Sequence, residues 1–505
     1  MTITELQQQY AFHPNVTVMC QLLKDVSVNH IFCGGLCASS ASLFSSALVQ
    51  KSPSPFVFIL GDLEEAGYFY HDLTQVLGGE QVLFFPSSFR RAIKYGQKDA
   101  ANEILRTEVL SRLQKGEKGL CIVTYPDALA EKVVSQEELD DKTLKLNVGE
   151  HVDSGFITEV LHSYGFEYVD YVYEPGQYAV RGSIIDVFSF ASEYPYRVDF
   201  FGDEVESIRT FEVDTQLSRE KKNSIVIVPD LALAGAMSSS FLDFIPKDTI
   251  LAMRDFLWLR ERIQTVHDEA LTPQALAVQE AEDNGGIKLE GALIDGAKFT
   301  VRALDFRRME FGNKPTGTPD ATIEFETTAQ PIFHKNFDLV AASFREYREK
   351  GYSLYICSDS RKQTERIRAI FEDRGDEIPF IAVERTLHEG FADDALRLCI
   401  FTDHQLFDRF HKYNLKSDKA RSGKVALSLK ELNQFTPGDY VVHTDHGVGR
   451  FSGLVRIPNG DTTQEVMKLV YQNEDVVFVS IHSLHKVSKY KGKEGEAPRL
   501  NKLGT

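Results

Sequence analysis

Cysteine is scarce in this chain, and the sequence has no long apolar segment. Its six cysteines among 505 residues are too few for a disulfide framework. No apolar run approaches the roughly 20 residues that cross a bilayer, and the first residues lack the basic flank and apolar core of a secretory signal. These features argue against a disulfide-rich secreted domain and a membrane protein, and they predict a cytoplasmic protein.

Positive charge is also in short supply. The chain has 56 Lys and Arg residues against 74 Asp and Glu residues, a formal net charge of −18. Non-specific nucleic-acid binding depends on surplus cations that neutralise phosphates, so this balance excludes a general nucleic-acid coat and favours protein partners. With 43% hydrophobic residues the chain can form several packed cores, and its length predicts about three to five domains.

The phosphate-binding motif GxxxxGK[ST] is absent from the sequence. The nearest candidate is CGGLCASSASLF, a glycine-rich turn between a predicted strand and a predicted helix. Ala38, Ser39, Ser40 and Ala41 stand where a lysine is required for the β- and γ-phosphates. Magnesium-binding carboxylate pairs of the Asp-Glu-x-His or Asp-Glu-x-Asp type are missing too. We therefore expect no ATP hydrolysis, no catalytic residue and no cofactor in this chain.

The sequence does not predict a metal site. Cys33 and Cys37 lie four residues apart without a second Cys or His cluster nearby, which is more typical of small buried residues than of zinc ligands. His443, Asp445 and His446 follow a predicted strand, at a turn where Asp and Gly are the expected residues.

The rhythm of apolar residues divides the chain into seven segments, and it predicts a multidomain protein of the mixed α/β and α+β classes. The segments are 1–127 and 213–330 (the two halves of an α/β domain), 128–212 (a small α+β module), 331–411 (a second, small α/β domain), 412–430 (a basic linker), 431–495 (a small β-barrel) and 496–505 (a lead-in to a further part).

The two α/β domains are predicted from strand-like runs that alternate with amphipathic helical patterns, an alternation typical of parallel sheets. The predicted strands of the first segment are 30–35, 55–60, 81–86 and 119–125. We assign a strand at 225–229 and a helix at 256–266 to the second half of the same domain.

The 128–212 module is predicted from alternation with a period of two. YAVRGSIIDVF and YRVDFFGDEVESIRTFEV both alternate, and Gly202-Asp203 marks a hairpin turn. The alternation places Tyr196, Val198 and Phe200 on one face and Arg197, Asp199 and Phe201 on the other.

The last segments change composition twice. Residues 412–430 hold six basic residues and one acid, which favours a solvated linker over a phosphate contact. From residue 431, short strands with regular breaks predict a small barrel. The sequence then stops without a closing element, and we interpret it as truncated.

Two stretches resemble known modules. YEPGQYAVRGSIIDVFSFASEYPYRVDFFGDEVESIRTFEVDTQLS (173–218) resembles a module shared by the excision-repair helicase subunit UvrB and the bacterial transcription-repair coupling factors (Mfd). FTPGDYVVHTDHGVGRFSGLVRI and the residues up to 492 resemble the CarD-like, RNA polymerase-interacting domain of the coupling factors, which UvrB lacks. Their order indicates the N-terminal portion of a coupling factor, a resemblance that covers essentially the whole chain.

This resemblance implies an adaptor for transcription-coupled DNA repair. In the family, the shared module binds UvrA and the barrel (CarD-like or Tudor-like) docks on the RNA polymerase β subunit. The first α/β domain would be a degenerate UvrB-like, helicase-like domain. An ATP-dependent translocase follows the barrel in the family; ATP, Mg²⁺ and most DNA contact would belong to that missing part. We expect a monomer.

The resemblance also implies residues for the UvrA contact. Arg181 falls on the arginine that the family uses against acidic groups of UvrA, and a planar guanidinium suits carboxylate pairing. The alternative is a solvated strand arginine paired with Asp199 or Glu204. Tyr178 and Phe201 would either add aromatic contact area or belong to the core.

Three neighbours of this predicted contact depart from the family pattern. UvrB typically carries arginine where this chain has Tyr168 and Ala179, and some coupling factors have a basic residue in place of Glu167. Fewer cations imply weaker or rearranged UvrA contacts.

In the barrel, the resemblance places the polymerase contact on one strand and turn: Leu454, Arg456, Ile457 and Pro458. An exposed apolar residue near a strand edge suits docking by strand addition. The alternative is that Ile457 closes the barrel core.

Two other identities are less compatible with the sequence than the adaptor. A UvrB-type helicase subunit would carry the phosphate-binding motif and would lack the 431–495 barrel. A CarD-type transcription regulator fused to α/β domains would lack the 173–218 stretch.

Overall fold

The computed structural model describes most of the chain, in segments. The described residues are 1–88, 100–213, 215–229, 231, 238–270, 291–409, 411, 413, 438–443, 446–459, 462–480, 487–490 and 500–502. They form two compact units, residues 1–141 with 231–415 and residues 142–230 with 416–505. The predicted linker 412–430, apart from Tyr413, and most of 496–505 lie outside the described residues.

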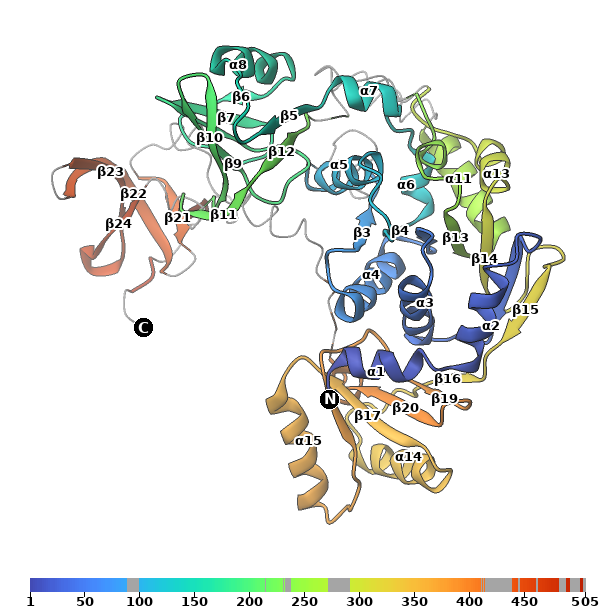
Figure 1. Ribbon diagram of the computed structural model, residues 1–505. Coiled ribbons are helices and arrows are strands. Elements are labelled where there is room, and N and C mark those ends of the chain that lie inside the picture. Colours follow the sequence, from blue (N-terminus) through green and yellow to red (C-terminus); the bar gives the residue numbers. More distant parts are fainter. Residues whose placement is uncertain are drawn as a thin grey trace. The chain divides into compact units, whose positions relative to one another are not determined.

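The first α/β domain is built on a seven-stranded parallel sheet in the order β15-β1-β14-β13-β2-β4-β3 (Figure 1). Its strands are β1 (His30–Gly34), β2 (Phe56–Ile59), β3 (Val82–Phe85), β4 (Cys121–Thr124), β13 (Ile250–Arg254), β14 (Arg307–Gly312) and β15 (Ala321–Glu324). Strands β1 to β4 are buried at every position, as expected for a parallel sheet covered on both faces. The four strands predicted in the first segment are therefore confirmed.

The helices of this domain connect the strands and pack on the sheet. They are α1 (Ile3–Tyr10), α2 (Pro14–Leu22), α3 (Ser40–Lys51), α4 (Leu63–Leu77), α5 (Ala100–Gln114), α6 (Pro126–Ala130), α7 (Gln136–Asp141), α10 (Phe241–Phe244), α11 (Phe256–Ala270) and α13 (Gly296–Ala303). Helix α11 confirms the helix predicted at 256–266. Helix α4 begins where the Asp62 carboxylate accepts hydrogen bonds from the backbone N–H groups of Glu64 and Glu65, both at 2.9 Å.

Strands β13 to β15 return to this sheet after a long excursion of the chain. Strands β14 and β13 lie between β1 and β2, with Arg308 beside His30 and Ile250 beside Phe56. Without β13 and β14, β1 would not be joined to β2, so the sheet of the first domain is complete only when residues 250–312 have folded.

Residues 142–230 form the α+β module. Its six-stranded sheet has the order β11-β10-β9-β8-β7-β6 and is antiparallel except for the pair β6–β7. The elements are α8 (Ser154–Ser163), β6 (Glu167–Tyr168), β7 (Gln177–Arg181), β8 (Ile184–Val187), β9 (Tyr196–Phe201), β10 (Glu204–Phe211) and β11 (Ser218–Lys222). The core includes Ile157 and Leu161 of α8 with Val198 and Phe200 of β9, which confirms that these two β9 residues share a face.

The two ends of the module pair with each other in a separate two-stranded sheet. Strand β5 (Leu144–Asn147) pairs antiparallel with β12 (Ser224–Ile227). The strand predicted at 225–229 is thus present, but it belongs to the module and not to the first α/β domain. The module extends beyond residue 212, where the sequence pattern placed its end, because β11 and β12 both pair within it.

The second α/β domain has a five-stranded sheet in the order β16-β19-β20-β17-β18. Its elements are β16 (Thr327–Ala329), α14 (Phe337–Glu349), β17 (Ser353–Ser358), α15 (Arg361–Asp373), β18 (Ile381–Glu384), β19 (Phe391–Asp393), β20 (Leu398–Thr402) and α16 (Asp403–Leu406). Helix α1 of the first domain lies beside this sheet (Figure 1), and the Glu384 N–H donates to the Met1 carbonyl at 2.9 Å.

The C-terminal part is a five-stranded antiparallel sheet in the order β24-β23-β22-β21-β25. It comprises β21 (Tyr440–His443), β22 (Gly447–Asn459), β23 (Thr462–Val470), the short helix η1 (Gln472–Glu474), β24 (Val476–Ser480) and β25 (Val487–Lys489). The predicted strands are present. Strands β24 and β25 are the edges of the described sheet, so its closure into a barrel stays a prediction. Nowhere in the described segments is there a helix long and apolar enough to cross a membrane.

The turn after β1 depends on glycine. Gly35 has φ of +78°, and a Cβ atom there would lie 1.9 Å from the Phe325 carbonyl oxygen. We expect Gly35→Ala to lower the free energy of unfolding by roughly 3 kcal/mol, because both strain and overlap with backbone would result. Urea unfolding followed by circular dichroism measures this loss.

Gly116→Ala is the matched control. Gly116 also has a positive φ, +67°, but apart from its chain neighbours no atom of the described residues lies within 4 Å of the added Cβ, so the expected loss is about 1 kcal/mol. An equal loss of unfolding free energy in the two variants would show that the close contact between Gly35 and the Phe325 carbonyl adds nothing to the cost.

Candidate partner-binding surfaces

The outer face of the module sheet carries a compact charge network centred on Asp186. The Asp186 side chain is fully buried on β8. Arg197 of β9 donates to both carboxylate oxygens of Asp186, with Nε–Oδ1 at 2.7 Å and Nη2–Oδ2 at 2.8 Å. The Arg181 guanidinium also donates to Oδ2. Bidentate pairing of this kind is the geometry that arginine favours with carboxylates, and it raises the pKa of Arg197.

Arg181 is oriented by this network while it stays partly open to solvent. About a third of its side chain, 35%, is exposed, and its guanidinium lies 5.1 Å from the centroid of the Tyr171 ring. Burial and the neighbouring Tyr171 raise the pKa of Tyr173 to about 12, so this phenol close to Arg181 stays neutral at physiological pH. Arg181 can therefore meet an acidic group of a partner without leaving an unsatisfied cation in the interior.

The register explains why Arg181 pairs with Asp186 and not with Asp199, one of the two partners named in the alternative interpretation. Arg181 lies directly opposite Ile184 on β8, so Asp186 is its diagonal neighbour on the same face. Asp199 lies one strand further away, on β9, where it contacts Arg209 at 3.5 Å. The sequence contained a usable signal, because Asp186 and Arg197 alternate with the inward-facing apolar residues of their strands.

Phe201 lies on the same face of the sheet as Arg181, two strands away. It ends β9 directly before the Gly202-Asp203 turn, where the predicted hairpin is confirmed, and 76% of its surface is exposed. Because β7 and β9 are separated by one strand, the two backbones lie about 10 Å apart. A cation and an exposed aromatic ring thus share one end of this face.

Tyr178 does not belong to this surface. It is only 7% exposed and lies in the module core, against the exposed Tyr168 ring at 5.5 Å between centroids. Ala179 is buried beside Phe188 and Phe211, so a small apolar side chain fits where UvrB typically has arginine. Glu167 is exposed.

The C-terminal sheet places its predicted contact residues on one long hairpin. Leu454 of β22 is 38% exposed. Arg456, Ile457 and Pro458 follow on the same strand and pair with residues 463–465 of β23. The edge strand β24 adds exposed apolar surface at Val476 and Phe478, which the sequence did not single out because both faces of that strand are apolar.

A cavity of about 400 Å³ opens at the carboxyl edge of the first sheet, beside the glycine-rich turn. Ala38, Ser39 and Ser42 line it at the start of α3. Its charged lining residues are Asp62, Glu64, Glu65, Asp72, Glu389 and Arg254. Five carboxylates against one arginine repel a triphosphate, so the residues present do not fit ATP.

The cysteine, histidine and aspartate residues considered as metal ligands do not converge on a site within the described residues. Cys33 is buried in β1, and Asp445 lies outside the described residues. Across the described ranges, no three His, Cys, Asp or Glu side chains gather so as to hold a metal ion.

Two family models match the parts of the chain that carry these surfaces. Residues 144–232 match the UvrB interaction domain, and residues 435–491 match the CarD-like/TRCF RID domain. The transcription-repair-coupling factor of Bacillus subtilis (strain 168) is 23% identical over 553 aligned residues, which cover 93% of this chain and 46% of the relative. That of Staphylococcus aureus (strain bovine RF122 / ET3-1) is 24% identical with the same coverage.

The chain is a relative of the transcription-repair-coupling factors. It spans about half the length of the curated coupling factors that it matches. The charged face of Arg181 and Phe201 lies in the part that matches the UvrB interaction domain, and the β22–β23 hairpin lies in the part that matches the RID domain.

Removal of the Asp186 charge tests the network in this coupling-factor relative. Asp186→Asn leaves Arg181 and Arg197 without their buried counter-ion, so we expect a loss of about 3 kcal/mol in the free energy of unfolding. Asp199→Asn, which removes a partly exposed carboxylate 3.5 Å from Arg209, should cost less than about 1 kcal/mol. Urea titrations compare the two; a smaller loss for Asp186→Asn would contradict its central place.

Proposed function

We propose that this chain is the adaptor portion of a transcription-repair coupling factor. It would bind stalled RNA polymerase through the C-terminal sheet and recruit UvrA of nucleotide-excision repair through the 142–230 module. The observation that carries the proposal is the presence of a UvrB interaction domain and a RID domain in one chain that is homologous to coupling factors over 93% of its length.

The module would present Arg181 and Phe201 to UvrA. Asp186 and Arg197 position the guanidinium, and Phe201 supplies exposed aromatic area on the same face of the sheet. A partner carboxylate would gain a charge-assisted hydrogen bond from Arg181. Because Ala179 is buried and Glu167 is acidic, the contact would rest on fewer cations than in UvrB.

The C-terminal sheet would dock on the β subunit of RNA polymerase. Leu454 offers exposed apolar surface, and Arg456, Ile457 and Pro458 continue the same strand. We assign the sheet to a small CarD-like, Tudor-like barrel, of which β21 to β25 are the described strands.

The remaining domains would support these two contacts. We assign the first α/β domain to a degenerate UvrB-like fold, whose acidic cavity opposes nucleotide binding. The ATP-dependent translocase, with ATP, Mg²⁺ and most DNA contact, would belong to the part of the family protein that this chain does not cover. We expect the chain to act as a monomer.

Charge reversal at Arg181 tests the UvrA contact. We expect Arg181→Glu to weaken binding of purified UvrA at least 100-fold in calorimetric titration, about 3 kcal/mol, because a partner carboxylate would be repelled. Arg361→Glu, on an arginine of α15 whose side chain is 87% exposed, is the control and should bind normally.

Phe201→Ser gives an independent reading, because this exposed ring can be removed without disturbing the core. It should weaken UvrA binding about tenfold. Wild-type affinity for both Arg181→Glu and Phe201→Ser would contradict the assigned surface.

A charge placed at Leu454 tests the polymerase contact. We expect Leu454→Arg to weaken binding to core RNA polymerase at least tenfold in biolayer interferometry, because the arginine would have to be desolvated at an apolar contact. Leu339→Arg, at an exposed leucine of α14, should leave this binding unchanged. Equal binding by the two variants would show that Leu454 is not part of the polymerase contact.

A further inference from the structure

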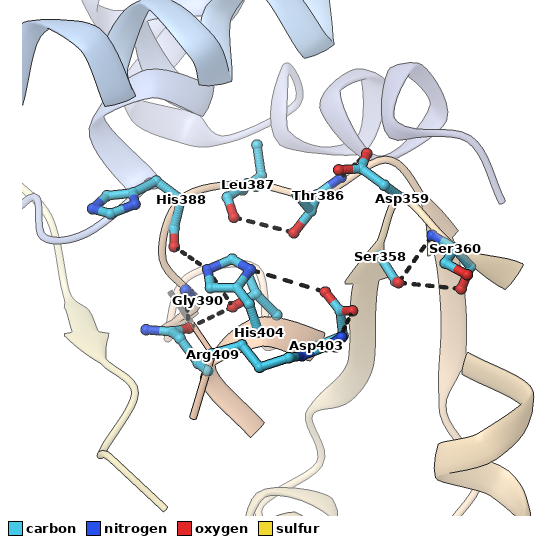
Figure 2. A network of polar contacts seen from close by, with 12 residues as sticks. Ser358, Asp359, Ser360, Thr386, Leu387, His388, Gly390, Asp403, His404 and Arg409 are labelled. Atoms are coloured by element: carbon cyan, nitrogen blue, oxygen red, sulfur yellow. Dashed lines mark hydrogen bonds and ion pairs between the residues drawn. The ribbon is translucent and has the colours of Figure 1, made fainter. Parts of the chain in front are cut away.

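Four histidines gather where α4 of the first α/β domain meets the second α/β domain. They are His71 on α4, His388 in the loop after β18, His404 on α16, and His411. The His404 and His411 rings are stacked with centroids 4.4 Å apart, and the His71 ring meets His411 edge-on at 4.9 Å. Tyr68 of α4 stacks on His388 at 3.5 Å. Figure 2 shows His388 and His404 with the residues around them.

Each of these histidines has one buried ring nitrogen without a hydrogen-bond partner among the described residues. These atoms are Nε2 of His71 and Nδ1 of the other three. The Nε2 atom of His404 lies 2.7 Å from the His388 carbonyl oxygen (Figure 2), so Nε2 carries the hydrogen and Nδ1 is bare. In a protonated imidazole both ring nitrogens carry hydrogens, so each of these unpartnered nitrogens would be a buried donor without a hydrogen-bond acceptor.

The same residues make the contacts between α4 and the second domain. The Tyr68 hydroxyl donates to the His411 carbonyl at 2.8 Å, and the His388 N–H donates to the Asp72 carboxylate at 2.7 Å. A further bond joins the second domain to the start of α3, where the Glu389 N–H donates to Ser39 Oγ at 3.0 Å. Protonation of these histidines would therefore place positive charge beside the hydrogen bonds that join the two domains.

The carboxylates around the cluster are already engaged. Asp72 also accepts from Ser42 at 2.8 Å, Asp359 accepts from the Thr386 N–H at 3.2 Å, and Asp403 pairs with Arg409 at 2.8 Å. His404 Nδ1 is 3.9 Å from Asp403 Oδ1, beyond hydrogen-bond distance. The other titratable groups facing the cluster are Tyr68, Cys357, Glu389 and Tyr413.

We propose that His71, His388, His404 and His411 form a pH-sensitive latch that holds α4 against the second α/β domain at neutral pH and opens when the pH falls. Only neutral rings can stack here with their unpartnered nitrogens buried among one another. Opening would give the rings access to water, where each can accept a proton.

The direction follows from the protons that the closed and open states bind. Burial, reinforced by the neighbouring histidines, lowers the pKa of His71 and His388 to about 4, and burial also lowers the pKa of His404 to about 4 and that of His411. In the open state the ordinary histidine pKa is about 6.5. The closed state thus binds fewer protons between these values, so its stability is complete above about pH 6.5 and is lost as the pH falls toward 4.

Asp72 works in the opposite direction. Burial raises its pKa to about 6, so the closed state holds a proton on this carboxyl that the open state releases. One carboxyl does not offset three or more histidines of comparable shift, and acidification therefore favours the open state.

Hydrogen exchange of the full chain tests the latch. The measured quantity is the protection of the peptide spanning residues 387–390 near pH 7 and near pH 5, corrected for the intrinsic pH dependence of exchange. We expect protection to fall at least tenfold in the wild type. In the variant His71→Gln/His388→Gln/His404→Gln/His411→Gln, which cannot take up these protons, the fall should be less than about twofold.

The double variant His151→Gln/His334→Gln, at exposed histidines elsewhere, is the control and should respond as the wild type does. Should the fourfold variant fail to fold, His404→Gln alone should show a smaller fall than the wild type. Unchanged protection in the wild type, or an equal fall in the wild type and the folded latch variants, would overturn the proposal.

Discussion

The pairing of β5 with β12 is the constraint on which the first half of the molecule depends. A folded module can interrupt a parallel sheet only if its two ends lie together. Strands β5 and β12 meet this condition, since Leu144 is opposite Ile227 and Asn147 is opposite Ser224. The chain therefore enters and leaves the module at neighbouring points, and β13 and β14 can complete the sheet between β1 and β2.

A second constraint acts on the outer face of the module. Asp186 is buried among strands whose other face forms the core, so its charge requires cations, and Arg197 and Arg181 supply them. Arg197 holds the carboxylate bidentately, which leaves Arg181 positioned and still partly exposed. The stability of the sheet and the presentation of a cation to a partner thus depend on the same carboxylate.

The sequence predicts where strands and helices lie better than it predicts which strands pair and which side chains meet. Strands β1 to β4 are predictable because each is a short apolar run between helical patterns. The run 225–229 was recognised as a strand but assigned to the wrong domain, since periodicity does not specify which sheet a strand joins. The family pattern indicates Arg181, whereas its contact with Asp186 follows from the β7–β8 register. Tyr178 is buried because side chains alternate between the two faces of β7, and its side chain lies on the face that forms the core.

Simultaneous binding is the central claim, because an adaptor must hold both partners on one chain. Mass photometry of the chain mixed with UvrA and core RNA polymerase tests it most directly. The account predicts a species whose mass is the sum of all three components. Only binary complexes, with UvrA and polymerase each displacing the other, would contradict it.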